Sequence, residues 1–169
     1  MRRAFLVYAA LSAALGVAYF PSYFNSVTRF DDEGAYVVTL REFLRHGSLY
    51  VDTHAPYGPF YYTVVGLVYR LTGQTPSLFN GRLIALAMTT VSSIFLAATV
   101  WRVTRSLVFG ALCQVVSYSI LATVTSDQPL HPGQLIVLLL SVMSYTLATY
   151  AMTQRTGSWR SSARSSERS

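Results

Sequence analysis

The chain has 169 residues, of which 52% are hydrophobic and only 12% are charged, and its mean hydropathy is +0.38. Soluble domains carry about 25% charged residues, so this composition excludes an ordinary soluble domain and a disordered chain. The net charge of +6 comes from arginines, without any lysine, that flank apolar runs. This distribution is typical of membrane proteins and argues against a nucleic-acid-binding surface. The single cysteine, Cys113, excludes a disulfide framework.

Four uncharged runs are each close to the roughly 20 apolar residues that a membrane-spanning helix needs. They cover residues of about 4–24, 83–101, 106–126 and 133–153. Buried core helices are the alternative, but four such runs leave too little polar sequence to cover them. A cleaved signal peptide is an alternative for the first run, although bulky aromatic residues continue past its small residues. We predict an all-α, polytopic membrane protein with about four transmembrane helices.

The arginines predict how the chain crosses the membrane. Arg2 and Arg3 precede the first run, which places the N-terminus in the cytoplasm and residues 25–82 in an outer loop. A fifth apolar run, residues 55–69, reaches only about 22 Å as a helix and is too short to span comfortably. If this run crossed the membrane, Arg102, Arg105 and the arginines of the C-terminal tail would lie on the outer side. The positive-inside rule therefore favours four spans with both termini in the cytoplasm. We expect the membrane to be a bacterial inner membrane.

The outer loop carries two predicted juxtamembrane helices, at about 33–46 and 58–71. In the first, one apolar stripe recurs at helical spacing, and Gly47 provides a stop. The second begins at Pro59, a favourable first residue of a helix. Its aromatic residues suit the membrane interface, so we expect this helix to be interfacial or re-entrant.

Three adjacent carboxylates, Asp31, Asp32 and Glu33, precede the first of these helices. One of them suffices as a helix cap, and carboxylates at a helix N-terminus are stabilised by the helix dipole. Three together repel one another, and such a cluster serves elsewhere as a general base or holds a divalent ion. The sequence does not decide whether these carboxylates only cap the helix or form a functional site. It contains no phosphate-binding glycine loop and no zinc motif, and we assign no metal ligand and no cofactor.

The order of these segments resembles a known family. The acidic DDEGAY is followed by VVTLREFLRHG, by the tyrosine-rich PYGPFYY, and by a span that begins with GRLIALAMTTV. This order is similar to the N-terminal part of polytopic GT-C-type glycosyltransferases, such as protein O-mannosyltransferases and aminoarabinose transferases. The resemblance covers residues 1–152. It implies transfer of a sugar from a polyprenyl-phosphate-linked donor to an acceptor at the outer face of the membrane.

The resemblance also implies roles for individual residues. Asp32 is the expected general base for the acceptor hydroxyl, with Glu33 beside it, and Asp127 is the acidic residue of the second outer loop. Arg82 and His54 are candidate ligands of the donor phosphate. Each residue also has a purely structural alternative. Asp127 could belong to an ordinary turn before the next span, and His54 could be a loop histidine bonded to backbone or water. Arg82 could extend its side chain from the span towards the lipid headgroups.

The chain departs from the family in length, because members have more spans. We therefore expect a fragment, a truncated reading frame or one piece of a split protein, inactive alone. Its expected partners are the donor, membrane lipid, and the missing C-terminal portion or another membrane subunit, but no nucleic acid. Residues 153–169, rich in serine and arginine, are predicted to form a disordered cytoplasmic tail. The alternative function is a non-enzymatic membrane scaffold or assembly subunit that reuses the module. A transporter is disfavoured because the spans contain no charge.

Overall fold

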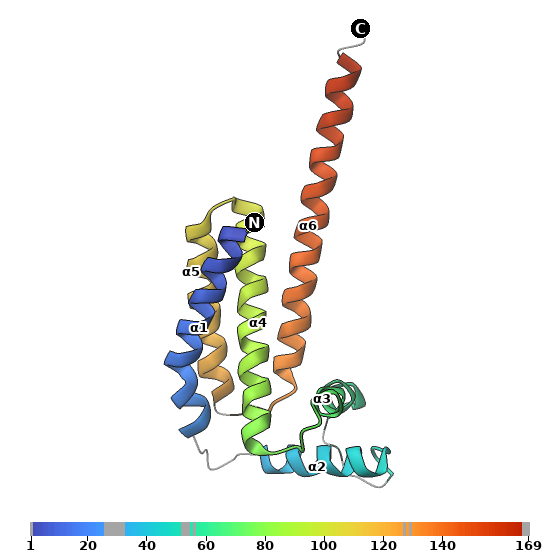
Figure 1. Ribbon diagram of the computed structural model, residues 1–169. Helices are drawn as coiled ribbons and strands as arrows, with labels where there is room; N and C mark the ends of the chain where they lie inside the picture. The colour runs from blue at the N-terminus through green and yellow to red at the C-terminus, as the bar shows by residue number, and fades with distance from the viewer. Residues whose placement is uncertain are drawn as a thin grey trace.

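A computed structural model gives a chain of six helices and no strand among the residues it describes (Figure 1). It describes residues 2–25, 33–51, 55, 57–126, 128 and 130–166, and the side chains of these except residues 2, 3, 5 and 155–166. The helices are α1 (Arg2–Asn25), α2 (Glu33–His46), α3 (Pro59–Thr72), α4 (Leu78–Thr104), α5 (Leu107–Ser126) and α6 (Gly133–Ser166).

Four of these helices are long and apolar enough to cross a membrane. The qualifying segments are Leu6–Asn25, Leu78–Thr104, Leu107–Ser126 and Gly133–Gln154. Many of their large apolar side chains are exposed, as expected for helices whose solvent is lipid hydrocarbon. The prediction of an all-α, membrane-embedded protein with four spans is confirmed.

The spans pack through small and polar side chains that recur at every fourth position. On α4 this buried stripe consists of Gly81, Ala85, Thr89, Ser93 and Ala97. A parallel stripe on α5 consists of Gly110, Gln114, Tyr118 and Ala122. Between membrane helices there is no hydrophobic driving force, so small residues that allow close backbone approach take its place. The stripes explain why α1, α4 and α5 form one bundle (Figure 1).

Two polar links hold α1 in this bundle. The Tyr23 hydroxyl lies 2.8 Å from Thr89 Oγ1 of α4 and 2.6 Å from Thr125 Oγ1 of α5. Near the other end of α1, the Gln114 side-chain amide donates to the Tyr8 carbonyl and to Ser12 Oγ, at 2.9 and 2.6 Å. Such bonds between membrane helices contribute about 0.6–2 kcal/mol each.

The two helices of the predicted outer loop lie at one end of the molecule, beside the first turns of α4 and α6 (Figure 1). Helix α2 has the predicted bounds and ends where Gly47, with φ of 79°, donates its N–H to the Phe43 carbonyl at 2.8 Å. Helix α3 begins at Pro59, as predicted, and ends at Thr72, where Gly73 follows with φ of 66°. Both glycines adopt the left-handed conformation that ends many helices. We call this end of the molecule the loop end.

The structure differs from the predicted boundaries at α4 and α6. Helix α4 begins at Leu78 instead of residue 83, because Ser77 Oγ accepts the Asn80 N–H at 3.2 Å and caps it. The predicted boundary relied on the charge of Arg82, which in fact lies inside the helix. Helix α6 continues to Ser166, where the composition predicts a disordered tail. Extending an existing helix is much easier than nucleating one, and arginine favours helices.

Candidate functional site

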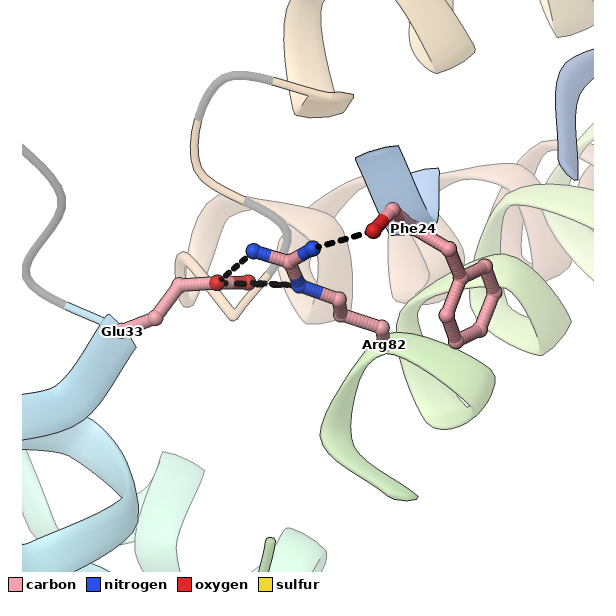
Figure 2. Close-up of polar contacts among 3 residues, drawn as sticks. All are labelled: Phe24, Glu33 and Arg82. Atoms are coloured by element: carbon pink, nitrogen blue, oxygen red, sulfur yellow. Dashed lines mark hydrogen bonds and ion pairs between the residues drawn. The ribbon is translucent and has the colours of Figure 1, made fainter. Parts of the chain in front are cut away.

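A buried ion pair lies at the loop end, where α1 ends and α2 and α4 begin. Glu33 is 1% exposed and Arg82 is 8% exposed. Arg82 Nε donates to Glu33 Oε1 and Oε2, at 3.2 and 3.0 Å, and Nη2 also donates to Oε2 (Figure 2). The guanidinium therefore grips both carboxylate oxygens, a geometry that is stronger and more specific than a single contact.

The two residues of the pair also interact with the end of α1 and the start of α2. Glu33 is the first residue of α2, where a negative charge is stabilised by the helix dipole. Arg82 Nη1 donates to the Phe24 carbonyl at 3.3 Å, and this carbonyl lies in the last turn of α1, where no intrahelical donor is available (Figure 2). One arginine thus joins the end of α1 and the start of α2 to the first turns of α4.

The segment that connects α5 with α6 packs against the same place. Leu130 is buried with Tyr36 and Val37 of α2. Its side chain also fills the space beside Gly81, where an added Cβ would lie 2.5 Å from Leu130 Cδ2. Any side chain in place of Gly81 would therefore force the Leu130 side chain to shift. The two predicted outer loops converge at the buried ion pair.

Tyrosines extend this contact. The Tyr61 hydroxyl of α3 donates to the Leu130 carbonyl at 2.7 Å, and the Tyr36 hydroxyl donates to the Tyr57 hydroxyl at 2.8 Å. Burial raises the pKa of Tyr61 far above its ordinary value, and Tyr62, Tyr69 and Glu33 raise it further. The Tyr61 phenol therefore stays protonated at neutral pH and serves as a hydrogen-bond donor, not as a base.

A cavity of about 580 Å³ lies between α4, α5 and α6, directly beside the segment of Leu130. Its walls combine three apolar side chains with hydroxyl, amide and imidazole groups. The lining residues are Thr89, Ser92, Leu121, Val124, Thr125, Gln128, His131, Gly133, Gln134 and Val137. Volumes of 300–1,000 Å³ are typical of small-molecule sites.

The predicted site residues are divided between the described part of the chain and the rest. Glu33 and Arg82, expected in different roles, are brought together in one ion pair. Asp32, Asp127 and His54 lie outside the described residues. The two acidic residues are, however, chain neighbours of described ones: Asp32 precedes Glu33, and Asp127 lies between Ser126 and Gln128. Among described side chains, no group of three histidines, cysteines or carboxylates is placed to hold a metal ion.

Sequence reasoning missed the pairing itself, the Tyr61–Leu130 bond and the cavity. A usable signal for the pairing was present. An arginine and a carboxylate both stand at the predicted membrane boundary, and charges at such positions usually have a partner. The Tyr61 bond and the cavity depend on contacts between helices far apart in sequence, which no local pattern reports.

The chain was compared with known proteins by family, by sequence and by structure. No family model matches it, and no curated protein and no solved structure is significantly similar.

Proposed function

We propose that this chain is a GT-C-like glycosyltransferase fragment, which transfers a sugar from a polyprenyl-phosphate-linked donor to an acceptor hydroxyl at the outer face of the membrane. The observation that carries the proposal is the convergence of both polar loops on the Glu33–Arg82 pair, at one end of a membrane-embedded bundle. A lipid-linked donor requires a site at this depth, where the phosphate meets water and the polyprenyl chain meets hydrocarbon.

Within this proposal, the general base is Asp32. A hydroxyl is a poor nucleophile until a base removes its proton, and a carboxylate at hydrogen-bond distance is a suitable base. Both oxygens of Glu33 already accept from Arg82, so we assign Glu33 a positioning role: it anchors the start of α2. Asp127 is the second acidic residue of the site in this proposal.

The donor phosphate is proposed to bind near Arg82 and His54. Arg82 donates to both oxygens of Glu33 and to the Phe24 carbonyl. The phosphate of the donor would therefore meet a cation that is already fixed in place. Such preorganisation reduces the entropy lost on binding.

Donor binding provides the direct test. With the purified chain in lipid nanodiscs, we expect polyprenyl phosphate to bind at least about tenfold more tightly than polyprenol of the same length, because a charge-assisted hydrogen bond contributes about 1.5–3 kcal/mol. Native mass spectrometry measures both affinities, with phosphatidic acid as the control for phosphate alone. Equal affinities for polyprenyl phosphate and either control would rule out a donor site.

The alternative function is a non-enzymatic scaffold or assembly subunit. It is favoured by one specific observation: Glu33, Arg82 and Tyr61 each bond within the chain, so packing alone accounts for them. A scaffold needs neither the donor nor the Asp32 carboxylate, whereas the proposed transferase needs both.

We also propose that the loop end faces outward in a bacterial inner membrane, with both termini in the cytoplasm. In a Cys113→Ser background, Gln74→Cys on the α3–α4 connection should react with a membrane-impermeant maleimide in intact cells. Ser106→Cys, on the α4–α5 connection, should react only after permeabilisation. Labelling of both from the same side would exclude this topology, and the reverse pattern would invert it.

A further inference from the structure

A second cavity, of about 470 Å³, lies at the loop end, between α2 and the connection from α3 to α4. Two arginines and a leucine of α2 form one wall, and three residues of the connection form the other. The six lining residues are Arg41, Leu44, Arg45, Gln74, Thr75 and Pro76. None of them is acidic, and all of them, with their chain neighbours, lie within the part of the chain that the structure describes. The lining is therefore positively charged.

Arg41 is fixed at the edge of this cavity, but its charge is not neutralised. Its Nε donates to the carbonyl of the buried Pro76 at 2.8 Å. Its two terminal nitrogens, Nη1 and Nη2, make no hydrogen bond or ion pair with any described residue. Arg41 is exposed, so a ligand can reach both nitrogens. The fold thus holds a cation in place and leaves its terminal donors available to an anion.

Arg45 brings a second positive charge to the same cavity. It lies one turn after Arg41 on the same face of α2, where like charges repel each other. Its Nη1 bonds to Glu42 at 3.2 Å, but that carboxylate is shared with His46 and does not line the cavity. An anion between the two guanidiniums relieves their repulsion, and guanidiniums bind phosphate oxygens through paired hydrogen bonds. The arrangement therefore suits a phosphate group.

The position of the cavity points to the phosphate of a lipid instead of a dissolved anion. The span of α4 begins at Leu78, two residues after Pro76, so the cavity lies at the depth of the headgroups. Apolar side chains flank the connection on both sides. Leu67 and Leu71 of α3 are 54% and 78% exposed on one face of that helix, and Leu78 is 46% exposed. Such side chains are stabilised by hydrocarbon, which the acyl chains of a bound lipid provide.

We propose that this cavity binds the headgroup of an anionic phospholipid, with the phosphate held by Arg41 and Arg45. The inference goes beyond the proposed function and does not rest on it, so it stands even if the chain transfers no sugar. Arg41 lies eight residues after Glu33 on α2, about 12 Å along the helix. The lipid site is therefore separate from the Glu33–Arg82 pair.

The test measures lipid binding to the full chain in detergent micelles by native mass spectrometry. We expect phosphatidylglycerol to bind at least about fivefold more tightly than phosphatidylcholine with the same acyl chains, because one basic residue at the headgroups favours an anionic lipid by about this factor. Glycerophosphoglycerol, the same headgroup without acyl chains, should not compete at equal concentration. Equal affinities for the two lipids, or full competition by glycerophosphoglycerol, would overturn the proposal.

Three arginine variants locate the binding site. Arg41→Gln and Arg45→Gln should each weaken phosphatidylglycerol binding about fivefold. Arg70→Gln, the matched control, removes an exposed charge of α3 that does not line the cavity, and it should leave the affinity unchanged. The Arg45 side chain is 69% exposed, so Arg45→Gln should fold normally even if loss of the Pro76 bond destabilises Arg41→Gln. The proposal is overturned if Arg45→Gln retains full affinity, or if Arg70→Gln lowers the affinity equally.

Arg45→Gln also separates this site from the proposed donor site. Polyprenyl phosphate should bind this variant as tightly as it binds the unchanged chain, because the donor is proposed to bind near Arg82. An equal loss of phosphatidylglycerol and polyprenyl phosphate would mean that the two lipids share one site, and it would overturn the separate phospholipid site. Because phosphatidic acid also suits this cavity, the donor comparison described above is repeated with Arg45→Gln, in which that contribution is weakened.

Discussion

Replacing Arg82 by glutamine is expected to lower the free energy of unfolding by about 3–5 kcal/mol, because it leaves a buried carboxylate without its charge partner. Glu33 is 1% exposed and has a short side chain that begins at the first residue of α2. It cannot reach water without unwinding the helix start. The variant also removes the donor to the Phe24 carbonyl and so exposes an unsatisfied end of α1.

Glu33→Gln should cost less than Arg82→Gln. The arginine that remains has a long side chain that can extend towards the headgroups and keep its charge hydrated. A charged Glu33 has no equivalent escape. Unfolding in mixed micelles of increasing SDS content, followed by circular dichroism, measures both variants. A larger loss for Glu33→Gln than for Arg82→Gln would contradict this account of the pair.

The chain offers a matched control on the same helix. Arg45 and Glu42 of α2 form an ion pair at 3.2 Å, but their side chains are 69% and 34% exposed. Exposed pairs contribute about 0.2–1 kcal/mol, so Glu42→Gln should be nearly neutral. The double variant Arg82→Met with Glu33→Leu should recover much of the lost stability, because replacing both partners by apolar residues is often neutral or better. Recovery would show that the pair fixes the positions of α1, α2 and α4 relative to one another more than it stabilises the fold.

The spans and the first juxtamembrane helix could be predicted from the sequence because their signals are local. An apolar run between arginines identifies a span, and an apolar stripe ending at a glycine identifies α2. The same reasoning placed the start of the second span too late. The pattern treats the charge of Arg82 as a membrane boundary, but Arg82 pairs with Glu33, 49 residues away, and is a buried residue of α4.

The tertiary features of the site could not be predicted because they depend on spacing between helices. The Tyr61 hydroxyl and the Leu130 carbonyl that it bonds, for example, are 69 residues apart along the chain. Gly81 is a second example. Its lack of a side chain leaves room for Leu130, which lies far away in the sequence, so the local pattern gives no reason for a glycine here.

Replacing Asp32 by asparagine is expected to reduce sugar transfer by about 10²–10⁴-fold, the usual contribution of a general base. Asparagine has nearly the same shape but cannot accept the proton of the acceptor hydroxyl. The loss should fall on kcat, because the donor phosphate is bound by cationic groups that the substitution leaves intact. Release of polyprenyl phosphate, measured in native membranes with the variant replacing the natural copy, gives this rate.

Two controls make the result specific to Asp32. Asp31→Asn changes the neighbouring acid, to which no role is assigned, and Glu42→Gln changes an acid on the exposed face of α2; both should transfer sugar at close to the normal rate. Membrane insertion and donor affinity should be the same in all three variants. If Asp32→Asn transfers sugar normally, Asp32 is not the base. If Asp31→Asn is equally impaired, the carboxylates act as a cluster. A loss confined to Asp32, with donor binding retained, would distinguish a transferase from a scaffold, because a scaffold has no use for a base beside its anchored helix.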